Sequence, residues 1–306
     1  MGKIAFVFTG QGAQYPGMGK ELYEHSSKAA ELYDLCESIR PNTKQQSFFG
    51  TAEELKMTEN TQPCIYLADM AAALALEEAG IKADAAAGFS LGEIAALAYG
   101  GAYSAEDGFK IVCKRGEFMG EASKEYDTKM VAVLKLDNET VEKTAAQFDG
   151  VYPVNYNSPG QIVVSGLSDK IEEFKQKISE FPCRCMDLAV SGGFHSPFMK
   201  SAAEKFSKEL ENFSLKKPSK DVYANFTALP YTENVAELMT KQICNPVCWQ
   251  KTIENMIKQG FDTFIEVGVG KTLSGLIKKT SKEVKVFNVE NLETLENTVK
   301  AVKTDA

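Results

Sequence analysis

Short runs of consecutive apolar residues alternate along this chain with segments in which apolar positions recur every three or four residues. The run 4–8 is typical of a strand buried on both faces of a parallel sheet, since a strand with one wet face would alternate apolar and polar residues. A further buried strand is expected at 263–267, although it contains Thr263 and Glu266. The intervening periodic segments predict amphipathic helices, among them 20–39, 64–78, 91–99 and 105–121. The alternation of the two patterns indicates an α/β fold.

The order of strand-like and helix-like hydrophobic patterns changes between residues 128 and 189. There the patterns predict a strand at 130–136, a helix at 138–148, strands at 151–156 and 161–165, a helix at 168–180 and a strand at 183–188. This βαββαβ order is that of a ferredoxin-like unit. We therefore predict a large α/β subdomain, residues 1–127 and 190–306, interrupted by a ferredoxin-like subdomain, residues 128–189.

The large subdomain contains further elements on both sides of the insertion. A short, alanine-rich strand is expected at 85–87, just before Ser90. After residue 190 we expect helices at 197–213, 235–241, 249–259 and 272–280, and strands at 222–225, 263–267 and 285–289.

The charge balance and the rare residues exclude several classes of function. A net charge of −8 argues against binding to nucleic acid or to anionic membranes. No apolar stretch reaches the roughly 18 residues of a membrane span, so we expect a cytoplasmic protein. The seven cysteines show no CxxC pair, and two histidines are too few for a histidine-based metal site.

Two glycine-rich segments invite a nucleotide-binding interpretation, and both fail on spacing. A GxGxxG loop after the first strand would need glycine where Tyr15 stands. The Gly-Lys-Thr at 270–272 lacks the earlier glycine of a P-loop, since position 265 is isoleucine. Nucleotide binding by either motif is disfavoured.

The stretch Gly88-Phe89-Ser90-Leu91-Gly92 fits the GxSxG pattern of a serine on a sharp turn between a strand and a helix. Glycines on either side allow such a turn, and the helix behind it would direct its free N–H groups at a developing oxyanion. The competing interpretation is a small residue in an alanine-rich packing surface. A nucleophilic serine also needs a base within reach, which the rest of the chain must supply.

His195 is the candidate base, because it lies in a loop between the insertion and the large subdomain, where catalytic groups are common. A histidine that only stabilises the loop remains the alternative, and His25 is read as a surface residue. Arg115 falls on an otherwise apolar helical stripe with Ile111 and Met119. Its guanidinium either reaches water, pairs internally, or holds a substrate carboxylate bidentately.

Eight motifs, in this order along nearly the whole chain, resemble the malonyl-CoA:acyl carrier protein transacylase family of bacterial fatty acid synthesis. They are FVFTGQGAQYPGMG, TQPCIYLADMA, GFSLGE, KRGEFM, VNYNSPGQIVVSG, GGFHSPFM, NPVCW and FIEVGVGKTLSGLIKK. Each motif is short, but their shared order is highly specific. The resemblance implies a hydrolase-like parallel-sheet domain with a ferredoxin-like subdomain, and malonyl transfer from malonyl-CoA to acyl carrier protein without a metal or redox cofactor.

The resemblance also implies roles for individual positions. Ser90 would be the acylated nucleophile and His195 its base, with Arg115 holding the malonyl carboxylate. The oxyanion would be bound by the main-chain N–H groups of Gln11 and Leu91. The remaining implied positions are a histidine-orienting backbone carbonyl at Cys248 and a substrate pocket that includes Phe89, Met119, Asn157 and Phe194.

Two positions depart from the family pattern. Phe89 stands where the family usually has histidine, so a polar contact to substrate is missing there. Cys248 replaces a usual glutamine, which a backbone role tolerates. Phe194 before the histidine favours a malonyl-selective member.

Three rival functions remain open at this level. A serine hydrolase or thioesterase would share the sharp turn at Ser90, called the elbow below. However, 111 residues follow His195, and no acidic residue stands out that would orient its ring. A discrete acyltransferase serving a polyketide synthase would share the whole site. A non-catalytic carrier-protein binder with a degenerate site is the third.

Overall fold

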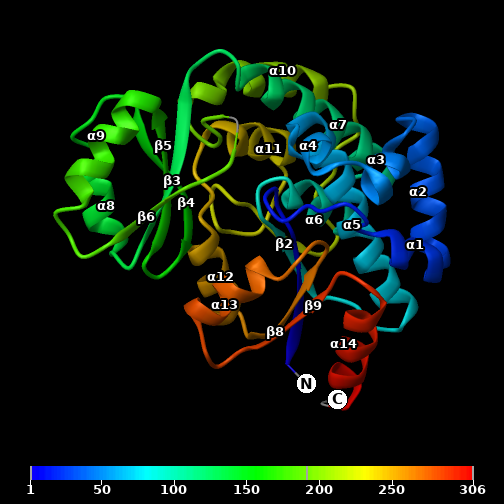
Figure 1. The fold of residues 1–306 in the computed structure, drawn as a ribbon. Coiled ribbons are helices and arrows are strands. Elements are labelled where there is room, and N and C mark those ends of the chain that lie inside the picture. Colours follow the sequence, from blue (N-terminus) through cyan, green and yellow to red (C-terminus); the bar gives the residue numbers. More distant parts are fainter. Residues whose placement is uncertain (1, 191, 305–306) are drawn as a thin grey trace.

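Two β-sheets of different kinds organise the chain, of which the computed structural model describes residues 2–190 and 192–304 (Figure 1). The larger sheet has five parallel strands in the order β7-β2-β1-β8-β9. Its strands are Lys3–Phe8 (β1), Ala85–Gly88 (β2), Asp221–Tyr223 (β7), Phe261–Val267 (β8) and Lys285–Val289 (β9).

Helices surround this sheet. They are Lys20–His25 (α1), Ser27–Ile39 (α2), Thr43–Phe49 (α3), Ala52–Lys56 (α4), Thr58–Glu78 (α5), Gly92–Tyr99 (α6), Ala105–Ala122 (α7), the single 3₁₀ turn Pro197–Met199 (η1), Lys200–Leu210 (α10), Val235–Cys244 (α11), Trp249–Lys258 (α12), Thr272–Thr280 (α13) and Leu292–Thr304 (α14).

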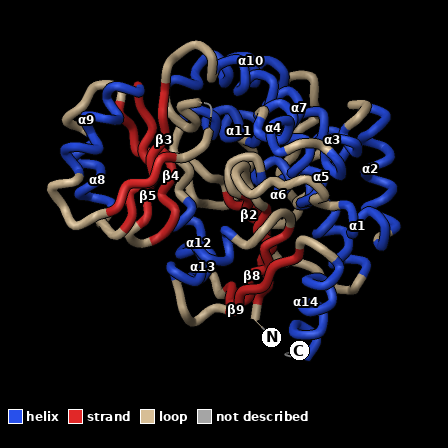
Figure 2. Tube along the Cα trace, in the orientation of Figure 1, coloured by secondary structure: helices blue, strands red, loops and turns tan. Residues whose placement is uncertain are grey.

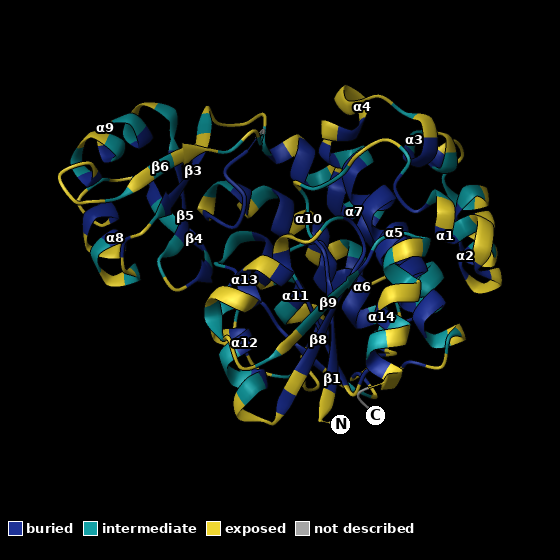
Figure 3. Cartoon of the chain, turned by 60° about the horizontal axis from the view of Figure 1, so that its bottom comes forward, coloured by how far each residue is buried: buried dark blue, intermediate teal, exposed yellow. Residues whose placement is uncertain are grey.

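The core lies on both faces of the parallel sheet, because successive strand residues point to opposite sides. In β1, Phe6 and Phe8 pack with residues of α5, α6 and α7, whereas Ala5 and Val7 pack with residues of α12 and α13. Figure 3 shows the central strands mostly buried between helices whose exposed residues face outward. The uninterrupted apolar run of β1 follows directly from this arrangement.

The smaller sheet is antiparallel and lies beside the larger one (Figure 2). Its strands have the order β4-β5-β3-β6. With its two helices it comprises Thr128–Leu134 (β3), Asn138–Ala145 (α8), Val151–Ser158 (β4), Gln161–Leu167 (β5), Ser168–Ile178 (α9) and Arg184–Asp187 (β6). This is the βαββαβ unit that the sequence predicts, inserted into an α/β domain as expected.

The two sheets are joined through the segment that precedes α12. Val247 donates its N–H to the carbonyl of Val154 at 2.8 Å and accepts from Tyr156 N–H at 2.9 Å, so it adds a short bridge to β4. Residues of the insertion and of the large subdomain are thereby held against each other.

Two sequence expectations about helices need correction. The helix expected over 20–39 is divided into α1 and α2, because Ser26 adopts an extended conformation and its side chain accepts the N–H of Ala29 as an N-cap. The helix expected from residue 64 begins six residues earlier, at Thr58, and contains Pro63.

Three helices, α3, α4 and α14, were not expected from the pattern. For α4 the sequence does carry a signal, since Thr51 and Glu54 form a capping box at its start.

Among the described residues, none of the helices combines the length and the apolar composition needed to cross a membrane.

Candidate active site

Ser90 lies on a tight turn between β2 and α6, at the carboxyl end of the parallel sheet. Its φ is +54°, in the left-handed region that a serine rarely adopts. A Cβ at Gly88 would lie 2.0 Å from the backbone of Gly92, and a Cβ at Gly92 would lie 2.3 Å from the carbonyl oxygen of Phe8. Both glycines of the GxSxG pattern are therefore required by close backbone approach.

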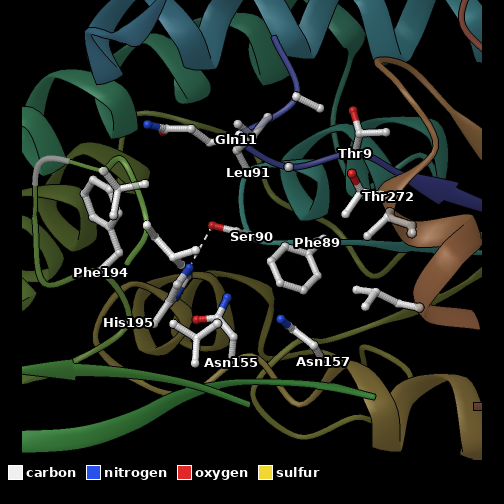
Figure 4. Close-up of a pocket in the computed structure, with 18 of the residues that line it drawn as sticks. Thr9, Gln11, Phe89, Ser90, Leu91, Asn155, Asn157, Phe194, His195 and Thr272 are labelled. Carbon is white, nitrogen blue, oxygen red and sulfur yellow. Dashed lines mark hydrogen bonds between the residues drawn. The ribbon is translucent and has the colours of Figure 1, made fainter. Parts of the chain in front are cut away.

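The structure brings His195 to this serine across 105 residues of sequence. The Ser90 Oγ and the His195 Nε2 are 2.7 Å apart (Figure 4). His195 also has a positive φ, 59°, in the loop that returns the chain from the insertion, and it is 3% exposed. His25, in contrast, is exposed and contacts the Glu21 carbonyl on its own helix.

The second ring nitrogen of His195 contacts a carbonyl oxygen different from the one expected. Its Nδ1 is 2.8 Å from the carbonyl of Gln242, so that nitrogen must carry the proton and Nε2 must accept from Ser90. The expectation that Cys248 supplies this carbonyl is wrong. The Cys248 carbonyl accepts the N–H of Thr252 at 2.9 Å in the first turn of α12.

The Gln242 carbonyl is free for this contact because of where α11 ends. In a continuing helix it would accept the N–H of residue 246, but that residue is Pro246, which has none. A proline four residues after Gln242 is the sequence signal that could have identified this carbonyl.

The buried imidazole is neutral near pH 7. Burial is the main cause that lowers the pKa of His195 to about 4, and the charge of Arg115 acts in the same direction. A neutral imidazole that accepts a hydrogen bond from a serine can take the proton of that serine during attack on a carbonyl carbon.

Arg115 enters the site from α7 and is completely buried. Its Nη1 donates to Gln62 Oε1 at 2.8 Å, and its Nη2 donates to Gln242 Oε1 at 2.9 Å and to Ser90 Oγ at 3.2 Å. The side chain therefore does not reach solvent. All three acceptors are neutral. Burial lowers the pKa of Arg115 only to about 10, so near pH 7 the guanidinium is a buried cation beside the serine hydroxyl.

Two more polar side chains hold the backbone of Ser90. Asn225 Oδ1 accepts the Ser90 N–H at 2.8 Å, and Gln242 Nε2 donates to the Ser90 carbonyl at 2.6 Å. Sequence reasoning missed Asn225, Gln242 and Gln62. Asn225 and Gln242 lie 135 and 152 residues from Ser90, so local pattern carries no sign of these contacts.

A pocket of about 270 Å³ opens on Ser90 between the two subdomains. The carboxyl ends of β1 and β2 contribute Thr9, Gln11 and Phe89, and the smaller sheet contributes residues of β3, β4 and β5. Gln11, Leu91 and His195 all line this pocket with Ser90, and Figure 4 draws Gln11 and Leu91 above Ser90 and His195 below it. Leu91 directly precedes α6, so its N–H belongs to the donors that a helix leaves unpaired at its start.

The other predicted pocket residues also line this space. Phe89 packs edge-on against Trp249 at 5.6 Å between ring centroids. Met119 accepts a weak hydrogen bond from Gln62 Nε2 at 3.6 Å. Phe194 lines the histidine side, and on β4 the buried Asn157 Oδ1 has no hydrogen-bond partner in the part of the chain that the structure describes.

The sequence matches the family described as "Acyl transferase domain" over residues 5–302. It is 40% identical to the malonyl CoA-acyl carrier protein transacylase of Bacillus subtilis, covering 99% of this chain and 98% of that protein. A transacylase of the same name from Staphylococcus aureus is 38% identical, covering 96% and 97%.

Solved structures agree over the full length. The malonyl CoA-acyl carrier protein transacylase of Clostridium perfringens superposes with a TM-score of 0.96 at 41% identity, covering 99% of this chain and 98% of that one. A malonyl-transacylase solved in complex with a type II PKS acyl-carrier protein has a TM-score of 0.93 at 30% identity, covering 98% and 99%. The predicted α/β fold with a small antiparallel subdomain is thereby confirmed.

Proposed function

The chain belongs to the acyl transferase domain family, and we propose that it transfers the malonyl group of malonyl-CoA to the thiol of acyl carrier protein, as an acyl carrier protein S-malonyltransferase. The observation that carries the proposal is the contact of one serine hydroxyl with both a neutral imidazole, His195, and a buried guanidinium, Arg115. Relatives that cover the whole chain bear this activity in their names. The cytoplasmic location expected from the sequence is part of the same proposal.

In the first half-reaction Ser90 attacks the thioester carbonyl of malonyl-CoA. His195 Nε2 takes the hydroxyl proton while the Oγ–carbon bond forms, and the Nδ1–H bond to Gln242 stabilises the imidazolium. The tetrahedral intermediate collapses when the carbon–sulfur bond breaks. The imidazolium returns its proton to the departing CoA thiolate, leaving a malonyl ester on Ser90.

In the second half-reaction the phosphopantetheine thiol of the carrier takes the place of CoA. His195 accepts the thiol proton, the sulfur attacks the malonyl ester, and the same proton returns to Ser90 as the carbon–oxygen bond breaks. The steps balance without any redox change. The negative oxygen of both tetrahedral intermediates is assigned to the N–H groups of Gln11 and Leu91, supported by the place of Leu91 at the start of α6.

Selection of malonyl is assigned to Arg115. Its three acceptors are uncharged, and its Nε atom is buried without a partner in the part of the chain that the structure describes. The charge of the buried Glu93 favours the cation, and a carboxylate on the acyl group would add an anion that binds it directly, with two parallel N–H···O bonds. Phe89, Met119 and Phe194 bound the acyl space with apolar atoms, and Asn157 lines the same pocket, where we place the pantetheine arm.

Intact-mass spectrometry tests the proposal directly. Protein mixed with malonyl-CoA should gain one malonyl group, and the adduct should be absent in Ser90→Ala. Addition of phosphopantetheinylated acyl carrier protein should then move the group to the carrier. Native protein that forms no adduct contradicts the proposal, and an adduct that water removes as fast as the carrier does indicates a hydrolase instead.

A second candidate concerns the carrier. One relative was solved with a type II PKS acyl-carrier protein, so a polyketide carrier is a specific alternative acceptor. Transfer rates from the preformed malonyl-enzyme to a fatty acid carrier and to a polyketide carrier distinguish the two.

A further inference from the structure

Glu93, the last residue of the GFSLGE motif, is a buried carboxylate that the mechanism above does not use. It lies in the first turn of α6 and is 1% exposed. Its Oε2 accepts the backbone N–H of Asn225 at 2.6 Å, and its Oε1 accepts the hydroxyl of Tyr231. Burial raises the pKa of Glu93 to about 7, and the two hydrogen bonds oppose that rise.

Asn225 links this carboxylate to the nucleophile. While its backbone is held by Glu93, its side chain brackets the elbow: Oδ1 accepts the Ser90 N–H at 2.8 Å and Nδ2 donates to the Gly88 carbonyl at 2.5 Å. The amide group of Asn225 therefore contacts the backbone on both sides of Phe89.

The elbow needs such support because Ser90 adopts a conformation that its side chain disfavours. A non-glycine residue with φ of +54° persists only where its surroundings determine it. The second support, Gln242, binds the Ser90 carbonyl, but it also contacts Arg115 and His195, so its loss would disturb several groups at once. Glu93 donates or accepts no hydrogen bond with Ser90 among the described residues: its two oxygens accept from Asn225 and Tyr231, while its charge also acts on Arg115.

We propose that Glu93 is a positioning residue: it fixes the backbone of Asn225, whose side chain holds Ser90 in the strained conformation that aims Oγ at His195. This inference rests on the proposed function, because it concerns the rate at which Ser90 is acylated. A protonated or an ionised carboxyl can accept the Asn225 N–H, and so can the amide oxygen of glutamine. Glu93→Gln should therefore keep most of the native rate of Ser90 acylation.

The test measures single-turnover acylation of Ser90 by malonyl-CoA, per folded molecule, across a range of malonyl-CoA concentrations. We expect Glu93→Ala to lower the maximal acylation rate at least tenfold while the half-saturating concentration changes less than twofold. Glu93→Gln should restore the rate to within about threefold of the native value. Tyr103→Phe is the matched control, because it removes a buried hydroxyl bonded to the Ile94 carbonyl of the same helix without touching Asn225.

A folded Glu93→Ala variant that acylates within twofold of the native rate overturns the proposal, and so does a Tyr103→Phe variant that is as slow as Glu93→Ala. If Glu93→Ala yields no folded protein, Asn225→Asp decides, because it keeps the side-chain volume and removes the donor to Gly88. A slow Asn225→Asp variant supports the proposal and a normal one overturns it. Native protein that is never acylated refutes the proposed function itself.

Discussion

The carbonyl oxygen of Gln242 lies 2.8 Å from Nδ1 of His195, and no carboxylate takes that place. The imidazole is therefore oriented by a neutral group. An acidic partner would stabilise the imidazolium and raise the pKa of His195, whereas here burial and the Arg115 charge lower the pKa to about 4.

As the pH is lowered, the rate of Ser90 acylation should therefore begin to fall only well below the usual pKa of histidine. We expect the rate of Ser90 acylation to stay nearly constant from pH 8 to about pH 5 and to be half-maximal near pH 4, where His195 takes up its proton. Rapid-quench acylation over this range checks it. A midpoint near pH 6.5 would contradict the lowered pKa that burial gives His195.

The same shift has a consequence for stability. The pKa of His195 is lower in the folded than in the unfolded protein, so its contribution to stability is fully present above pH 6.5 and is lost as the pH falls towards 4. Chemical denaturation of native protein and of His195→Gln at pH 7 and pH 4.5 measures this. The variant should lose less stability between the two pH values than the native protein does.

Replacing Pro246 should disturb the histidine without changing any side chain that contacts it. Pro246→Ala restores an N–H that can extend α11 and compete for the Gln242 carbonyl, so we expect acylation to slow about 3- to 10-fold, the worth of one hydrogen bond. Cys248→Ala is the control and should leave the rate within twofold. A Pro246→Ala variant that acylates at the native rate would contradict the role assigned to the Gln242 carbonyl.

Arg115 should determine selectivity for the acyl group. Arg115→Ala removes the buried cation, and we expect malonyl transfer to fall about 100-fold because a charge-assisted bidentate contact is lost. Acetyl transfer, which has no carboxylate to bind, should fall far less. Comparison of the two acyl-CoA substrates with the same variant checks this, and equal losses would exclude a carboxylate-binding role.

The elbow glycine next to the helix should be intolerant of a side chain. Gly92→Ala would place a methyl group 2.3 Å from the Phe8 carbonyl oxygen, so we expect a loss of about 3 kcal/mol in the free energy of unfolding. Gly275→Ala in α13 is the matched control, since nothing lies within 4 Å of the added atom. It should stabilise the protein by about 0.5–1 kcal/mol, measured by denaturant titration.

Much of the fold could be predicted because it rests on local pattern. The doubly buried strand β1 appears as an apolar run, and the change of hydrophobic pattern after residue 128 reveals the inserted βαββαβ unit. The division between α1 and α2 was missed because apolar periodicity continues across Ser26 while its side chain caps a new helix. Helix α14 was missed although its amphipathic face packs on β9.

For the candidate site, too, one part could be predicted from the sequence and another could not. The sequence by itself determined which residue types were available: one serine between two glycines, one histidine in a loop and one arginine on an apolar stripe. Only the tertiary structure decided which carbonyl meets His195, that Arg115 turns inward to Ser90, and that Asn225 and Gln242 hold the serine backbone. Those contacts join residues up to 152 positions apart, and their partners are chosen by how the helices end and pack, which no local pattern records.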